Sequence, residues 1–406
     1  MSAIHTEPVI LDGKSLTIDA IVGVARFGRP VELTASARDR IQHCRRFVEE
    51  RVAERAVMYG ITTGIGELSE VVLTPDQTRD FQRYIVYSHS AGCGVPLPPE
   101  VVRAAMCSRI NVLANGHSGI RLAIVDTLIQ MLNKGVTPVV FEKGSVGACG
   151  DLSPMSQMAL VLLGEGEAYY RGKRMPGAEA MKAAGVPTVD FEARDGLATI
   201  NGSNMTAGFG SLELYDADRY YKSAEIAAAI TLEVLNANMV AYDERIHKVR
   251  GYPSAIACAA NVRKLVDGSE MLKQKGKKVQ DAYSLRSTPQ VTGGAKDASK
   301  WAKQMFETEL NGVGDNPIFF PDERLYLTGA NFQGTPLGIS LDLVGSCITM
   351  VAVLSERRTN RLLNRNLSAG LPAFLTKGAG MFSGLMLTQY TQGMLICEDR
   401  ILSAPA

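Results

Sequence analysis

Apolar residues recur along most of this chain at the three- and four-residue spacing of amphipathic helices. Residues 36–58 place Ile41, Cys44 and Phe47 on one stripe, with arginine and glutamate elsewhere, which predicts a helix. Similar patterns predict helices over 98–116, 119–134, 154–163, 208–240, 253–275 and 335–364. Several of these segments are apolar on more than one face, which is typical of helices buried in a bundle or between subunits.

Strand patterns are few and local. Residues 167–175 and 317–327 carry alternating apolar positions around Arg-Gly-Lys and Pro-Asp-Glu turns, and each predicts a hairpin. The pattern therefore predicts a mainly α protein, a long-helix bundle with a mixed N-terminal head.

Composition narrows the classes of partner. Lys+Arg number 43 and Asp+Glu 42, so the net charge of +1 gives no basic surplus for nucleic acid. The apolar run 343–354 is about a dozen residues long, which we expect to be too short to span a bilayer. The start has no apolar signal region, and the seven cysteines are scattered. We therefore expect a reduced, cytoplasmic location, with no membrane partner, disulfide framework or metal site.

Four polar, glycine-bearing segments interrupt the helical pattern. Because glycine clusters between helices mark turns or close backbone approach, four of them suggest one site built by loops. The segments are 59–67, 144–154, 195–204 and 328–336.

The second segment contains Ala148-Cys149-Gly150. Attack of the Gly150 nitrogen on the Ala148 carbonyl, loss of water and loss of the Cys149 sulfur would give a five-membered ring with an exocyclic methylidene. Such a ring is an electrophile that captures an amine covalently. The tripeptide alone also fits a plain turn, a buried thiol or a nucleophilic cysteine with a histidine partner.

A series of motifs carries a family resemblance from residue 11 to the end of the chain. It includes "YGITTGIG", "SHSAGCGVPL", "GSVGACGDLSPMSQMALVLLGEGEA", "DGLATINGS", "QDAYSLRSTPQVTGG", "ELNGVGDNP" and "GANFQGTP". In this order they resemble the histidine/phenylalanine/tyrosine ammonia-lyase and aminomutase family, whose members use a methylidene-imidazolone (MIO) ring. The resemblance implies an ammonia-lyase (fumarase/aspartase-like) architecture and a homotetramer with active sites shared by three subunits. We expect an N-terminal domain over 1–200, with the MIO-forming loop, and a helical bundle domain over 201–406.

The resemblance assigns roles around the tripeptide. Ala148, Cys149 and Gly150 align with the Ala-Ser-Gly precursor of the MIO ring, which forms autocatalytically without a metal. Tyr59 matches the base that removes a β-hydrogen; a phenol is a weak acid, so the site would have to stabilise the phenolate. Asn201 matches the asparagine beside the ring. By themselves, Tyr59 also fits a core tyrosine at a helix end and Asn201 a turn residue.

Further matches lie in the second half of the chain. Tyr283 matches a tyrosine that assists elimination, and Arg286 an arginine that grips the substrate carboxylate through its two-pronged guanidinium. Alone, Arg286 also fits a surface cation. Gln290, Asn331 and Phe332 match pocket residues.

Ser88 and His89 occupy the position that recognises the aromatic ring. His89 can hydrogen-bond an imidazole or a phenol, so we rank histidine first as the substrate, then tyrosine or phenylalanine. The predicted enzyme is a carbon–nitrogen lyase that removes ammonia from an aromatic L-amino acid to give an arylacrylate. An aromatic amino-acid 2,3-aminomutase would share all of these residues.

Three departures leave alternatives open. Cys149 stands where the family has serine, the chain stops at "EDRILSAPA" where the family is expected to continue into a further helical region, and Gly314 replaces a common hydroxyl residue. The chain is then also compatible with an MIO-less lyase acting on a quaternary ammonium substrate. A non-catalytic homologue with a structural or binding role is the remaining alternative.

Overall fold

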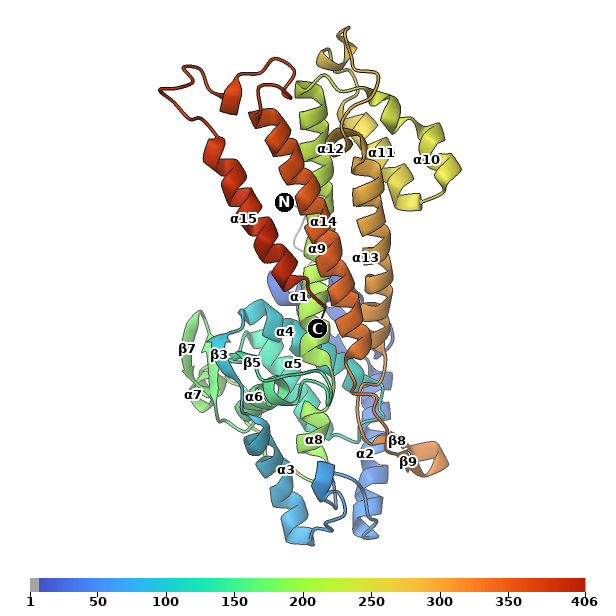
Figure 1. The fold of residues 1–406 in the computed structure, drawn as a ribbon. Helices are drawn as coiled ribbons and strands as arrows, with labels where there is room; N and C mark the ends of the chain where they lie inside the picture. The colour runs from blue at the N-terminus through green and yellow to red at the C-terminus, as the bar shows by residue number, and fades with distance from the viewer. Residues whose placement is uncertain (1–6, 406) are drawn as a thin grey trace. The chain divides into compact units, whose positions relative to one another are not determined.

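The computed structural model describes residues 7–405, and long helices dominate it (Figure 1). The predicted mainly α class is confirmed. The chain forms two compact units. The first contains the chain as far as Glu213 and Gln304–Gly338, and the second contains Leu214–Lys303 and the residues from Ile339 onward. The expected domain boundary at residue 200 stays a prediction.

The first unit is a helical head around a buried central helix. Helix α4 (Pro99–Ala114) is buried over nearly its whole length and packs against α1, α2 and α5. Its start at a proline pair and its end before Asn-Gly agree with the predicted segment 98–116. The other helices of the unit are α1 (Ile18–Phe27), α2 (Ala35–Ala53), α3 (Pro75–His89), α5 (Leu122–Lys134), α6 (Leu152–Leu162), α7 (Gly177–Ala184) and α8 (Asp195–Ile200).

The first unit also contains several small sheets. The predicted hairpins are confirmed as β6–β7 (Glu167–Tyr170, Lys173–Pro176) and β8–β9 (Ile318–Phe320, Leu325–Leu327). The sequence pattern did not predict the remaining strands, which are only two to four residues long. They are β4 (Thr137–Pro138) beside β6, the parallel pair β1 (Val9–Leu11) and β2 (Val31–Leu33), and the antiparallel pair β3 (Cys93–Pro96) and β5 (Phe141–Lys143).

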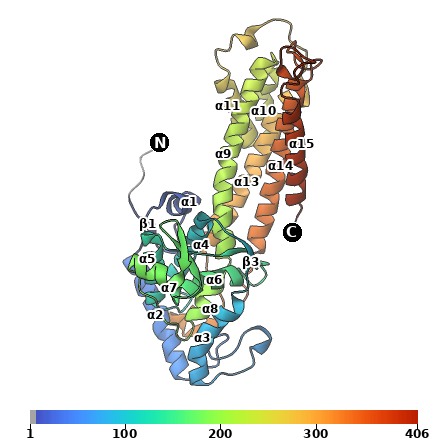
Figure 2. The same ribbon diagram turned by 90° about the vertical axis from the view of Figure 1, so that its left-hand side faces the viewer.

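The second unit is a bundle of long helices. Its main helices run side by side in both views (Figures 1 and 2). They are α15 (Met386–Leu402) and most of α9 (Asn204–Val234), α13 (Thr288–Asn311) and α14 (Thr335–Leu363), each of which has one end in the first unit. Hydrogen bonds join α9 to α13 through Tyr221 and Ser299 (2.9 Å), and α14 to α15 through Glu356 and Gln389 (3.1 Å). Shorter helices complete the unit: α10 (Glu244–Arg250), α11 (Pro253–Leu265) and α12 (Tyr283–Arg286).

Helix α14 contains an 18-residue window that is long and apolar enough, by length and composition, to cross a membrane. This window is longer than the dozen residues counted in the sequence, because it extends across Asp342. Core helices of helical bundles have the same composition. Within the chain 28% of the window is buried, so much of its apolar surface has no cover from residues of the same chain.

Candidate active site

The tripeptide Ala148-Cys149-Gly150 lies in the loop between β5 and α6. Ala148 and Cys149 are exposed, whereas Gly150 is buried. Two glycines of the loop, Gly147 and Gly150, both adopt φ +70°, a conformation that favours residues without a Cβ. The Gly150 amide donates to the Gly147 carbonyl at 3.3 Å, so the loop turns back on itself at the tripeptide.

Gly150 rests directly on the backbone of Gly202, next to Asn201. A Cβ at Gly150 would lie 2.8 Å from the carbonyl carbon of Gly202, and the Asp151 amide donates to the Gly202 carbonyl at 2.8 Å. Position 150 therefore requires glycine both for its backbone angle and for this close approach. The glycine that cyclisation needs as its nitrogen donor is also the residue that the local packing selects.

The carboxylate of Asp151 anchors the base of the loop. It accepts hydrogen bonds from the Thr206 amide (2.8 Å), the Thr206 hydroxyl (2.9 Å) and the Ser145 hydroxyl (2.9 Å). Burial raises the pKa of Asp151, and these hydrogen bonds oppose that effect. The carboxylate thus links both ends of the tripeptide loop to the start of α9.

The segment with Asn331 and Phe332 also contacts this loop. The Gly334 amide donates to the Gly147 carbonyl at 3.0 Å, and the Ser203 hydroxyl donates to the Phe332 carbonyl at 2.7 Å. Three of the four glycine-bearing segments therefore meet at the tripeptide, whereas the sequence led us to expect all four in one site.

Asn201 follows α8 and is held beside the segment "GVGDNP". Its side-chain amide donates to the Asn316 carbonyl at 3.0 Å. Asp315, fully buried, receives the guanidinium groups of Arg109 (3.3 Å) and Arg194 (2.7 Å), which are fully buried as well. Buried charges persist only when they are paired and hydrogen-bonded in this way. The three side chains join segments that are far apart in the sequence beneath Asn201.

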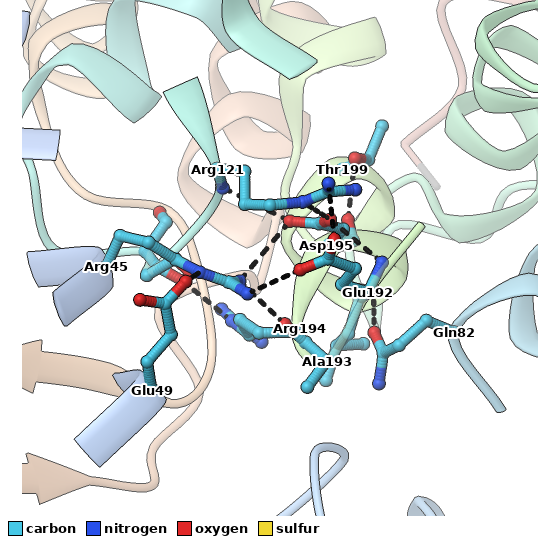
Figure 3. A network of polar contacts seen from close by, with 12 residues as sticks. Arg45, Glu49, Gln82, Arg121, Glu192, Ala193, Arg194, Asp195 and Thr199 are labelled. Carbon is cyan, nitrogen blue, oxygen red and sulfur yellow. Dashed lines mark hydrogen bonds and ion pairs between the residues drawn. The ribbon is translucent and has the colours of Figure 1, made fainter. Parts of the chain in front are cut away.

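A second polar network fixes the start of α8 (Figure 3). Asp195, the first residue of the helix, accepts from Arg121 at 2.5 Å and lies 3.5 Å from Arg45. It also accepts from the Glu192 amide at 3.0 Å. Burial is the largest influence on the pKa of Asp195 and raises it, while the two arginines lower it. The network holds the short helix that ends at Asn201.

Tyr59 is half-buried in a tight turn between α2 and α3. Its hydroxyl accepts a hydrogen bond from the Gly66 amide at 3.1 Å. The turn is fixed by threonine hydroxyls, since Thr62 accepts from the Met58 amide at 2.8 Å and Thr63 from the Gly60 amide at 3.2 Å. The Gly66 amide thus fixes the position of the phenol oxygen.

Ser88 and His89 end α3. The Nδ1 atom of His89 lies 2.8 Å from the Ile85 carbonyl. Because a carbonyl can only accept, Nδ1 carries a proton, and in the tautomer with this single ring proton Nε2 is an acceptor. The Ser88 hydroxyl donates to the same carbonyl at 3.1 Å. His89 is thus suited to accept a hydrogen bond from an N–H or O–H group.

The remaining predicted residues, Tyr283, Arg286 and Gln290, belong to the second unit. Arg286 and Gln290 line a cavity of about 360 Å³, and the Arg286 guanidinium lies 4.3 Å from the centre of the Tyr283 ring. Two buried atoms here, Nε of Arg286 and Oε1 of Gln290, have no hydrogen-bond partner among residues 7–405. Such unpaired groups are available to a polar ligand.

Gln280 lines the same cavity and was missed by the sequence reasoning. With its amide oriented to satisfy both of its atoms, its oxygen accepts from Nη1 and Nη2 of Arg286 at 3.1 and 2.6 Å. The available signal was its place three residues before Tyr283 in "QDAYSLR". Within residues 7–405, no group of histidine, cysteine, aspartate and glutamate side chains is arranged to hold a metal.

Glu309, in the first unit, has a shifted pKa that the sequence did not predict. Burial, together with the nearby charge of Asp151, raises its pKa to about 7. A Cβ at Gly314 would lie 3.1 Å from its carboxylate oxygen. Any side chain at position 314 would therefore press against this carboxyl group.

We expect Glu309 to make stability depend on pH. The folded state holds the proton more tightly than the unfolded state, so its contribution falls as pH rises from about 4.5 to about 7. Glu309→Gln should raise the unfolding free energy by on the order of 1–2 kcal/mol at pH 8 and change it little at pH 4. Thermal unfolding at both pH values measures this, with exposed Glu307→Gln as the control; equal shifts at both pH values would contradict it.

Comparison with known proteins identifies the family of this chain. The model of the aromatic amino acid lyase family matches residues 16–406. A histidine ammonia-lyase of Caldanaerobacter subterraneus subsp. tengcongensis is 46% identical over 399 residues, which cover 98% of this chain and 78% of the relative. The solved tyrosine aminomutase from Streptomyces globisporus has a TM-score of 0.93 at 35% identity, covering 98% of this chain and 79% of its own. The histidine ammonia-lyase from Trypanosoma cruzi has a TM-score of 0.89 at 35% identity, covering 98% and 75%.

The family match and the histidine ammonia-lyase relatives show that the chain is a carbon–nitrogen lyase of the ammonia-lyase class. The family match covers nearly the whole chain, and relatives above 40% identity align with almost all of it. The chain belongs to the aromatic amino acid lyase family. The family, architecture and enzyme class expected from the sequence are confirmed.

Proposed function

We propose that this enzyme eliminates ammonia from an aromatic L-amino acid, histidine first and tyrosine or phenylalanine next, to give an arylacrylate. The observation that carries the proposal is the seating of Gly150 on Gly202, with φ +70° and no room for a side chain. A self-cyclising tripeptide needs a glycine in this position. The names of the relatives, many of them histidine ammonia-lyases, support the reaction.

The tripeptide Ala148-Cys149-Gly150 is the proposed source of an MIO ring. The Gly150 nitrogen forms a bond to the Ala148 carbonyl carbon, whose oxygen leaves as water. The Cys149 Cα–H proton and the Cβ–Sγ bond are then lost, so sulfur leaves as hydrogen sulfide and a methylidene remains. No oxidant, reductant or metal enters the balance. The close approach of Gly150 to Gly202 and the exposed Cys149 side chain fit this chemistry.

The chain's own side chains would perform the proton transfers. The ring would supply an electrophile that takes up the substrate amine and makes it a better leaving group. Tyr59 removes the β-proton, and the Gly66 amide holds its hydroxyl group in position. Asn201, held through Asn316, would present its amide to the ring oxygen.

A cavity in the second unit supplies the substrate clamp in this proposal. The Nε atom of Arg286 is a donor without a partner among residues 7–405, which suits a carboxylate. The Oε1 atom of Gln290 is an unpaired acceptor there. Gln280 and Tyr283 hold the guanidinium in place.

The aromatic ring of the substrate is assigned to Ser88 and His89, with Asn331 and Phe332 as further pocket residues. The acceptor Nε2 of His89 favours a ring that donates a hydrogen bond, such as imidazole or phenol, over phenyl. This preference supports the ranking of histidine and tyrosine above phenylalanine.

The assembly we propose is a cytoplasmic homotetramer. Many apolar side chains of α14 and α15 are exposed in the single chain, among them Met350 (65%) and Tyr390 (65%). Large exposed apolar faces mark subunit contacts, and copies of the chain would cover them. Binding of nucleic acid or membranes is not part of the proposal.

A 2,3-aminomutase is the second candidate function, favoured by the close structural match to the tyrosine aminomutase. It differs in returning ammonia to the β-carbon before release. A single experiment separates the candidates. The intact mass of the purified enzyme is measured by mass spectrometry. The enzyme is then incubated with histidine, tyrosine and phenylalanine, and the arylacrylate absorbance and the amount of β-amino acid are measured.

The expected mass is ~52 Da below that of the unmodified chain, from loss of water and hydrogen sulfide, with an arylacrylate as the main product. A β-amino acid as the main product would select the aminomutase. An unmodified mass with turnover would indicate an MIO-less lyase. An unmodified mass with no turnover of these three amino acids would indicate either a non-catalytic homologue or an MIO-less lyase that acts on a quaternary ammonium substrate.

A further inference from the structure

Gln82 lies at the meeting point of three segments that the proposed reaction uses. It is fully buried on α3, the helix that ends with Ser88 and His89. Its Nε2 donates to the Gly60 carbonyl and its Oε1 accepts from the Leu197 amide, both at 3.2 Å. Figure 3 shows Gln82 beside the network at the start of α8.

The first of these hydrogen bonds holds the turn that carries Tyr59. Gly60 follows Tyr59 directly, and among residues 7–405 its carbonyl receives a hydrogen bond from Gln82 alone. A Cβ at Gly60 would lie 2.4 Å from the Leu197 side chain, so the turn and α8 are in direct contact. Movement of the Gln82 amide would therefore move the backbone next to the proposed base.

The second hydrogen bond reaches Asn201 through one helical turn. The Leu197 amide is one of the first-turn donors that a helix cannot satisfy internally, and Gln82 satisfies it. The Leu197 carbonyl in turn accepts from the Asn201 amide at 3.0 Å. A Cβ at Gly196 would lie 2.2 Å from the Gln82 carbonyl oxygen, so α3 and α8 approach as closely as backbones can.

We infer that Gln82 is a positioning residue, which sets Tyr59 and Asn201 in register for proton removal. The inference rests on the proposed roles of those two residues. An amide side chain is required because one partner is an acceptor and the other a donor. Leucine offers neither group, and a carboxylate can only accept.

The test uses Gln82→Leu, Gln82→Glu and the control Thr78→Val, which removes another buried polar group of the same helix. For Gln82→Leu we expect kcat to fall about 10²-fold, as for a small misplacement of a catalytic group. The KM should stay within about threefold and the ring mass should be unchanged. Thr78→Val should retain wild-type kcat.

The pH dependence of kcat in Gln82→Glu is a measurement that a general loss of stability would not change. Burial raises the pKa of a carboxyl, and the protonated acid can donate to Gly60 as glutamine does. Its kcat should approach the wild-type value at low pH and fall toward that of Gln82→Leu as pH rises, relative to wild type. If Gln82→Leu does not fold, the pH profile of Gln82→Glu still tests the inference. A profile parallel to wild type, or equal losses in Gln82→Leu and Thr78→Val, would overturn the inference.

Failure of the proposed function gives a different result. If the wild-type chain shows no turnover, hydrogen exchange of the Leu197 amide still tests the bridge. Exchange should be at least about tenfold faster in Gln82→Leu than in Thr78→Val, since the amide loses its buried acceptor. Equal exchange would overturn the inference about Gln82 itself.

Discussion

Replacing Tyr59 by phenylalanine should lower kcat about 10³-fold, the usual contribution of a positioned general base. The substitution removes the hydroxyl that accepts from Gly66 and keeps the ring. Thr62 and Thr63 hold the turn through their own hydrogen bonds, so the backbone should stay in place. Steady-state kinetics with the best amino acid substrate measures the loss.

Intact mass separates catalysis from maturation in this variant. Tyr59 takes no part in ring closure, so Tyr59→Phe should show the same mass deficit as wild type. Tyr84→Phe, which alters an exposed tyrosine on α3, is the matched control and should keep full activity. Retained turnover in Tyr59→Phe would refute its role as the base.

Cys149→Ala should bring turnover down to background, a loss of at least about 10³-fold. Alanine has no leaving group on Cβ, so no methylidene can form and the chain should keep its full mass. Cys149→Ser should restore the ring through loss of a second water, with a mass deficit of ~36 Da. Mass spectrometry and the arylacrylate assay on the same preparations measure both outcomes.

Cys397→Ala, at another exposed thiol, is the control for effects of thiol loss in general and should behave as wild type. Turnover by Cys149→Ala at the wild-type rate would exclude a catalytic electrophile at this position. In that case, the family's usual chemistry would not apply to this chain.

The helices were predictable where local signals are strong. Segment 335–364 became α14 almost residue for residue, because its apolar pattern is continuous. Helix α2 ends at Ala53, five residues before the predicted end at 58, because the chain turns there toward Tyr59. Helix α13 was not predicted: its first turns contain Gly293 and Gly294, of which Gly293 lies against Ala255 so closely that a Cβ would be 2.5 Å away. That tertiary contact leaves no mark on local periodicity.

The sequence predicts candidate site residues where the residue type itself suggests a chemical role. Tyr59, Arg286 and the tripeptide carry side chains or sequences with an evident role. Gln82 and Gln280 act through the position of an amide, and glutamine is common on any helix or loop. Their partners, Leu197 and Arg286, become visible as partners only when the chain is folded.

The buried pairing of Asp315 with Arg109 and Arg194 has a consequence for the timing of maturation. These residues lie 206 and 121 positions apart in the chain, and Gly334 must also be in place to hold the tripeptide loop. Residue 149 is therefore synthesised well before Asp315 and Gly334, which hold its surroundings in the folded chain. The nascent chain therefore carries an ordinary thiol at Cys149, and in the proposed maturation hydrogen sulfide would be released only after the first unit has folded.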